Sequence, residues 1–132
     1  MKIIRKTSAP LNAQRIDDIH RIRGCEFLDI SNVKKITAAD YNKMEKDKDH
    51  VLLDVREQYE FEQINIGGKH VPLSMLFSYS NEIPKNKTIV VHCKSGKRSL
   101  IAIKILKELG FSDLLNLDGG IIAYLEHVNK KD

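Results

Sequence analysis

The segment from Thr88 to Ala102 constrains the fold of this chain more than any other stretch. It begins with the apolar, β-branched run Ile89-Val90-Val91, which predicts a buried strand leading through His92 to Cys93. A short polar loop with one glycine follows, and a helical pattern of apolar residues starts directly after it. This order builds anion-binding pockets, because loop N–H groups and the positive end of the helix point at one place. We therefore expect an anion pocket with Cys93 on its rim.

Cys93 has the sequence neighbours of a reactive thiol. Thiolates beside basic side chains or helix N-termini have pKa values lowered to roughly 3.5–7.5. We expect Cys93 to be the nucleophile of a catalytic site. The residues expected to bind the substrate are those of the loop: Lys94, Ser95, Gly96, Lys97, Arg98 and Ser99. A buried structural cysteine is the alternative, but such a residue has no need of a basic, glycine-containing loop after it.

Composition and charge exclude several classes of function. The 132 residues correspond to one domain, and no apolar run approaches the ~20 residues that cross a bilayer. Two cysteines are too few for a disulfide scaffold, so we expect a cytoplasmic protein. The net charge of +4 arises from residues 1–23, whereas the remainder is balanced. A nucleic-acid-binding domain carries its basic patch on the folded body, so we expect neither nucleic acid nor membrane as a partner.

Hydrophobic patterning divides the chain in two. Residues 1–32 have weak periodicity and are interpreted as a basic N-terminal linker or arm, in which Cys25 is a packing residue. Residues 33–132 form the expected domain, in which strands alternate with helices. Ser74 is expected to cap a helical turn. The strands are predicted at 33–36, 51–55, 70–73, 89–91 and 114–117. This alternation predicts an α/β protein with a parallel sheet covered by helices on both faces.

Several short motifs follow one another in a characteristic order. They are Asp54-Val55-Arg56-Glu57, Tyr59-Glu60-Phe61, the loop from Cys93 to Ser99, Gly110-Phe111 and Leu117-Asp118-Gly119-Gly120. With these motifs, residues 36–128 resemble a rhodanese domain. The resemblance implies an α/β fold around a five-stranded parallel sheet. It also implies a sulfurtransferase without metal or cofactor, in which Cys93 carries a persulfide between a sulfane sulfur donor and an acceptor.

A second resemblance is narrower. The stretch from Ile64 to Gly68, followed by His70-Val71-Pro72-Leu73, is similar to the rhodanese domain of molybdopterin- and thiamine-type adenylyltransferase-sulfurtransferases. It implies a ubiquitin-like sulfur carrier protein as acceptor and an adenylyltransferase domain as partner. No glycine-rich nucleotide loop occurs in this chain. Many rhodaneses have Gly-His-Ile-Pro-Gly where this chain has Asn65 to Gly68, so no role is transferred for that histidine.

Two other functions remain open. A phosphatase or arsenate reductase needs Cys-x5-Arg to enclose a tetrahedral oxyanion. Here Arg98 follows Cys93 in a Cys-x4-Arg pattern, and this six-residue loop suits a single sulfur atom better. A non-catalytic binding module of the rhodanese type is the second alternative. Inactive rhodanese domains usually lose the cysteine, which this chain retains.

Residues beside the loop have less certain roles. Asp54 and Arg56 follow a neighbouring strand, where they either support this face of the sheet or form an ion pair that orders a loop. His92 points to the opposite face of its strand from Cys93. We interpret His92 as a packed or hydrogen-bonded residue, not a metal ligand.

Overall fold

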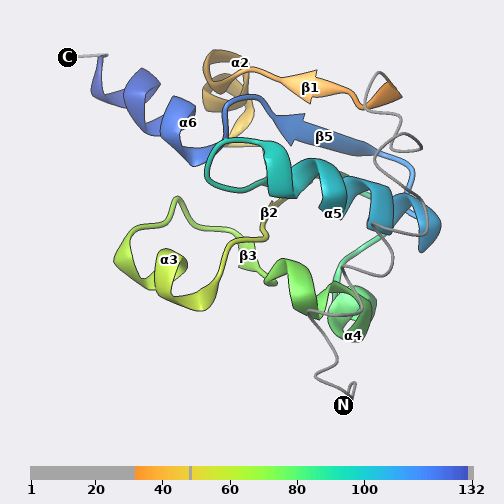
Figure 1. The fold of residues 1–132 in the computed structure, drawn as a ribbon. Helices are drawn as coiled ribbons and strands as arrows, with labels where there is room; N and C mark the ends of the chain where they lie inside the picture. Colours follow the sequence, from red (N-terminus) through yellow and green to blue (C-terminus); the bar gives the residue numbers. More distant parts are fainter. Residues whose placement is uncertain (1–31, 48, 131–132) are drawn as a thin grey trace.

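The structure is a computed structural model that describes residues 32–47 and 49–130. Five parallel strands form one sheet in the order β1-β5-β4-β2-β3, which confirms the predicted architecture (Figure 1). The strands are β1 (Lys35–Ile36), β2 (His50–Asp54), β3 (Lys69–His70), β4 (Thr88–His92) and β5 (Leu114–Leu117). Because β4 lies between β2 and β5, whatever follows its carboxyl end sits in the middle of one sheet edge. Expectations for Cys25 and for nearly all of the arm lie outside the described residues.

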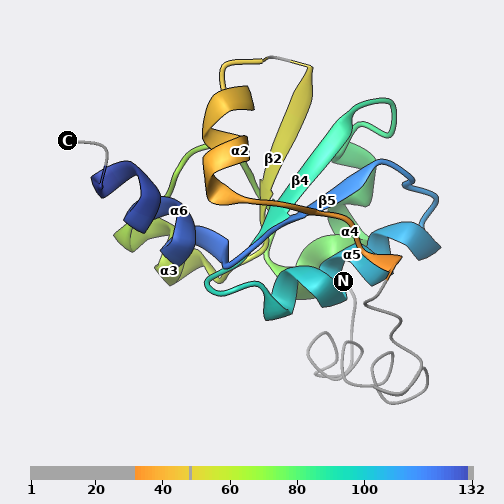
Figure 2. The same cartoon turned by 90° about the horizontal axis from the view of Figure 1, so that it is seen from above.

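The strands carry apolar side chains on both faces, as a parallel sheet covered on both sides requires. Leu52 and Val90 pack on one face beneath α2 (Ala38–Met44) and α6 (Gly120–Asn129). Leu53 and Val91 pack on the other face with α4 (Leu76–Tyr79) and α5 (Lys97–Glu108). The helices therefore lie on both faces, as predicted (Figure 2). The remaining helix, α3 (Gln58–Gln63), follows β2, and among the described residues no helix is long and apolar enough to cross a membrane.

Two polar residues near helix starts have different roles. Thr37 caps α2, since its Oγ1 accepts a hydrogen bond from the Asp40 N–H at 3.1 Å. The expected cap at Ser74 is wrong. Ser74 lies inside the 3-10 helix η3 (Leu73–Met75), which starts after Pro72. Proline fixes φ near the value that such a turn needs, and the Pro72 carbonyl accepts the Met75 N–H at 2.8 Å. A second 3-10 helix, η4 (Ser80–Glu82), follows α4.

Candidate active site

Cys93 directly follows β4 and opens the loop that leads into α5. Its side chain is 1% exposed, so the thiol lies at the base of the loop and not on the rim as expected. The Sγ atom accepts hydrogen bonds from the backbone N–H groups of Gly96 at 3.1 Å and Ser99 at 3.4 Å. The curled loop therefore points its N–H groups at the sulfur, which is the arrangement that the sequence predicted.

The same contacts determine the ionisation of Cys93. Burial raises the pKa of the thiol, but the hydrogen bond with the Ser99 side chain and those from the N–H groups of Ser99, Gly96 and Ser95 outweigh it. The net result is a pKa below the usual value for cysteine. Hydrogen bonds within the loop therefore favour the thiolate.

A polar residue of β5 supports this loop, and the sequence analysis missed it. The Asn116 amide oxygen lies 2.5 Å from the Ser99 hydroxyl, which donates to it, and the amide nitrogen lies 3.5 Å from the Gly96 carbonyl. Ser99 Oγ is in turn 3.5 Å from Cys93 Sγ. Asn116 is 4% exposed. A single polar residue within the apolar strand Leu114–Leu117 was the available signal, because a buried amide requires partners.

The first turn of α6 fixes the loop from the other side. The Ile121 N–H donates to the Cys93 carbonyl at 2.9 Å, and the Ile122 N–H donates to the Lys94 carbonyl at 3.2 Å. This close approach depends on Gly120, which has φ +65° and whose missing Cβ would lie 2.4 Å from the Lys94 oxygen. The Gly-Gly pair after β5 therefore allows a helix N-terminus to bind the backbone of the cysteine loop.

The positive charge of Arg98 is paired with a carboxylate. Its guanidinium forms two hydrogen bonds with the Glu60 carboxylate, Nη1–Oε1 at 2.7 Å and Nη2–Oε2 at 2.9 Å. The hydrogen bonds from Arg98, assisted by the N–H of Glu57, hold the pKa of Glu60 at about 2 despite some burial. The pair joins α3 to the first turn of α5. Sequence reasoning did not connect these residues, which are 38 positions apart.

Asp54 and Arg56 form a buried ion pair at the end of β2. Arg56 Nη2 lies 2.8 Å from Asp54 Oδ2, and Arg56 Nε also bonds both carboxylate oxygens. The guanidinium additionally donates to the carbonyls of Ile64 at 2.8 Å and Glu60 at 3.3 Å. None of the hydrogen bonds described for this pair reaches Cys93. The geometry therefore favours an ion pair that orders the segment around α3.

His92 is fully buried beside this pair, with Nε2 3.7 Å from Asp54 Oδ2. Neither ring nitrogen has a hydrogen-bond partner among the described residues. Burial lowers the pKa of His92 despite the attraction of Asp54, which favours the neutral ring. In the described part of the chain, no three His, Cys, Asp or Glu side chains are grouped to hold a metal ion.

A cleft of about 260 Å³ lies beside the cysteine loop. We call it the loop cleft; Tyr59, Glu60, Ile64, Lys94 and Ile122 are among the residues that line it. Tyr59, Ile64 and Ile122 are 64%, 50% and 41% exposed, which is unusual for large apolar side chains. The loop cleft thus combines exposed apolar side chains with Lys94, the residue that follows Cys93.

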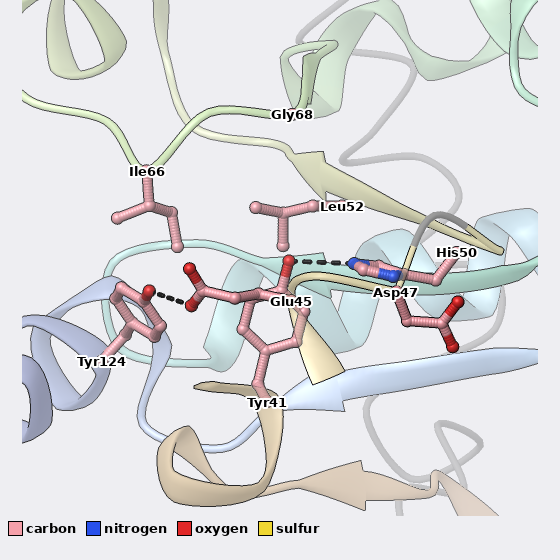
Figure 3. Close-up of a pocket in the computed structure, with 8 residues that line it drawn as sticks. All are labelled: Tyr41, Glu45, Asp47, His50, Leu52, Ile66, Gly68 and Tyr124. Atoms are coloured by element: carbon pink, nitrogen blue, oxygen red, sulfur yellow. Dashed lines mark hydrogen bonds between the residues drawn. The ribbon is translucent and has the colours of Figure 1, made fainter. Parts of the chain in front are cut away.

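A second cavity, of about 390 Å³, lies under α2 and α6 (Figure 3). Its polar groups bind one another: the Tyr41 hydroxyl lies 3.0 Å from His50 Nε2, and the Tyr124 hydroxyl donates to the Glu45 carboxylate (Figure 3). His50 is the first residue of β2, whereas the cysteine loop follows the last residue of β4. This larger cavity therefore lies away from the thiol, and the loop cleft is the site of interest.

Comparison with known proteins identifies the family to which the chain is similar. The model of the rhodanese-like domain family matches residues 37–127. The chain is 36% identical over 80 residues to "Probable adenylyltransferase/sulfurtransferase MoeZ" of Mycobacterium tuberculosis; the match covers 58% of this chain and only 20% of that protein. It is 37% identical over 81 residues to "Sulfurtransferase" of Allochromatium vinosum, covering 61% of this chain and 76% of the relative. Another relative is "tRNA uridine(34) hydroxylase" of Wigglesworthia glossinidia brevipalpis, 32% identical over 119 residues that cover 84% of this chain and 38% of that protein.

A solved structure agrees with these matches. The crystal structure of a rhodanese-related protein from Thermoplasma volcanium superposes with a TM-score of 0.65 and 30% identity. The alignment covers 71% of this chain and 92% of that one. The central parallel sheet, the hydrogen-bonded cysteine loop after its middle strand and the matched sequence region agree on one conclusion: the chain belongs to the rhodanese-like domain family.

Proposed function

We propose that this protein is a sulfurtransferase that carries a persulfide on Cys93. One observation carries the proposal most directly. Gly96 and Ser99 direct their backbone N–H groups at the Cys93 sulfur, and these groups favour an anion at that position. Relatives named sulfurtransferases support the same class of reaction.

The reaction consists of two transfers. The Cys93 thiolate attacks the outer, sulfane sulfur of the donor, and the S–S bond of the donor breaks. With thiosulfate as donor, sulfite leaves with the electron pair of that bond, and Cys93 becomes a persulfide anion. A nucleophile of the acceptor then attacks the terminal sulfur. The bond between the two sulfurs breaks, and its electrons restore the thiolate. The loop N–H groups stabilise the anion at both stages.

The surface beside the loop supports a protein as acceptor. Tyr59, Ile64 and Ile122 present exposed apolar area around Lys94, and aromatic and aliphatic anchors of this kind carry much of the energy of protein interfaces. We propose a ubiquitin-like sulfur carrier protein as acceptor and an adenylyltransferase domain as a further partner. The name of the MoeZ relative, an adenylyltransferase/sulfurtransferase, supports the adenylyltransferase domain.

The alternatives fit the geometry less well. A phosphatase needs its loop arginine to close around the oxyanion, whereas the Arg98 guanidinium is engaged by Glu60 through two hydrogen bonds. A non-catalytic module has no need of a thiol with a lowered pKa, but Cys93 has one. Both observations favour the sulfurtransferase.

The central test is sulfur transfer by the purified protein from thiosulfate to cyanide. Wild type should form thiocyanate, and incubation with thiosulfate alone should add the mass of one sulfur atom. Cys93→Ser should abolish both, because serine is nearly isosteric but cannot form a persulfide. Cys25→Ser serves as the matched control and should retain activity. An active Cys93→Ser protein, or a wild type that hydrolyses aryl phosphates without ever forming a persulfide, would refute the proposal.

The extent of the domain is a separate proposal. We propose a rhodanese domain of residues 33–132 preceded by a linker or arm, in a cytoplasmic protein. Residues 1–32 contain several Lys and Arg residues, and their apolar residues have weak periodicity. Limited trypsin digestion should therefore remove them before it cleaves the body of the domain. An arm as resistant as residues 36–128 would show that it packs as part of the fold.

A further inference from the structure

The charges around the cysteine loop differ from what the sequence suggests. Lys94, Lys97 and Arg98 look like three cations that attract an anionic donor. Arg98, however, is paired with Glu60, and this pair is mostly shielded: the side chains are 33% and 14% exposed. Among the described residues that line the loop cleft, Arg56 is likewise paired, with Asp54, and Lys94 has no ion-pair partner. The charge that remains unbalanced in this cleft is thus a single lysine.

Glu60 contacts both the loop cleft and the Arg98 guanidinium. Its carboxylate lines the loop cleft, and both of its oxygens accept from the guanidinium. Arg98 directly precedes Ser99, whose backbone N–H donates to Cys93 Sγ at 3.4 Å, so it belongs to the same turn as the residue that holds the thiol. The hydrogen bonds with Glu60 raise the pKa of Arg98 despite partial burial. If Glu60 were neutral, Arg98 would present its full charge next to the reacting sulfur.

We propose that Glu60 sets donor specificity by neutralising Arg98, so that the site disfavours dianionic sulfur donors relative to monoanionic ones. This inference rests on the proposed sulfurtransferase function. Glu60 acts through Arg98 and is therefore a positioning residue that controls charge, not a catalytic residue. A cleft with one unbalanced lysine suits a persulfide donor, which carries one negative charge, better than it suits thiosulfate, which carries two.

The test compares two donors that undergo the same reaction. Thiosulfate is a dianion and releases sulfite, whereas benzenethiosulfonate is a monoanion and releases benzenesulfinate; both leave one sulfur on Cys93. Removing a unit negative charge about 6 Å from a bound donor, in a water-like dielectric, raises the affinity for that donor about threefold if it is a monoanion and about tenfold if it is a dianion. Glu60→Gln should therefore lower KM for thiosulfate about tenfold and KM for benzenethiosulfonate about threefold. The value of kcat should stay within about twofold, since the glutamine oxygen can still accept from Arg98 and from the Glu57 N–H.

Glu62→Gln is the matched control. Glu62 lies on the same helix, is exposed and bonds Gln58 at 2.7 Å, so its removal changes the net charge equally without freeing Arg98. Its effect on either KM should be below about twofold, because exposed charges are screened by salt. A merely structural role for Glu60 predicts something else: kcat would fall to the same extent with both donors, and KM would not follow donor charge. Either that result or an unchanged thiosulfate KM in Glu60→Gln would overturn the inference.

The wild-type protein provides a second test that needs no variant. With Arg98 neutralised, KM for thiosulfate should rise by less than about threefold when salt increases from about 20 to about 200 mM. A rise of about tenfold or more would show that the site holds more unbalanced positive charge than Lys94 alone supplies and would overturn the inference. Failure of the wild type to form any persulfide would refute the sulfurtransferase itself, which is distinguishable from both outcomes.

Discussion

Replacement of Gly120 by alanine tests whether α6 holds the cysteine loop in place. The new Cβ would lie 2.4 Å from the Lys94 oxygen and 2.6 Å from the Cys93 oxygen, so the backbone must move. Left-handed φ costs ~1 kcal/mol for a residue with a Cβ. Overpacking against the backbone costs a further ~1–3 kcal/mol. We therefore expect Gly120→Ala to lower the free energy of unfolding by about 2–4 kcal/mol, as measured by urea denaturation.

Gly67→Ala is the matched control for this change. Gly67 also has a left-handed φ, +88°, but a Cβ there would meet no heavy atom within 4 Å. It should therefore cost only the backbone strain of ~1 kcal/mol. Gly120→Ala should in addition move the midpoint of Cys93 alkylation upward, because the displaced loop bonds the sulfur less well. Equal destabilisation by the two variants, with an unchanged midpoint, would refute the role assigned to α6.

Three further perturbations address charge at and near the site. Iodoacetamide should alkylate Cys93 with a midpoint below the usual ~8.5 of a cysteine thiol, because its pKa is lowered; the rate should be maximal above the midpoint and fall as pH decreases through it. A midpoint at or above that value would contradict the hydrogen-bonded loop. Asp54→Asn should lower the free energy of unfolding by ~3–5 kcal/mol, since it leaves buried Arg56 without its counter-charge; urea denaturation measures this, and a loss below ~1 kcal/mol would contradict it. Lys94→Ala combined with Lys97→Ala should raise KM for thiosulfate more than for benzenethiosulfonate and raise the alkylation midpoint slightly; steady-state kinetics with no difference between the donors would contradict a role through charge.

The fold could be predicted from the sequence where residues close together in the chain determine the structure. The apolar runs that became β2 and β4 are fully buried over most of their length, and such runs have few alternatives to a parallel sheet. The loop after Cys93 was likewise predictable, because a glycine between a strand and a helix forces the chain to curl. These features involve residues that are close in sequence.

The sequence was insufficient where distant residues meet. Glu60 and Arg98 are 38 positions apart, and each looks like an ordinary surface charge until α3 and α5 are placed. Asn116 of β5 contacts Ser99 of α5, and the two residues are 17 positions apart. The hydrogen-bond partner of the Asn116 amide could therefore not be identified from neighbouring residues. The depth of Cys93 could not be predicted either, since it depends on how closely α6 approaches the loop. Tertiary packing decides all three.

The bonds from Ile121 and Ile122 to the cysteine loop also have a consequence for biosynthesis. A nascent chain that has just emerged through β5 already contains every residue of the loop, yet the N–H groups that hold the Cys93 and Lys94 carbonyls are still missing. During translation the thiol is therefore present before the structure that shields it is complete. The hydrogen bonds that hold the Cys93 and Lys94 carbonyls can therefore form only after the first turn of α6 has been synthesised.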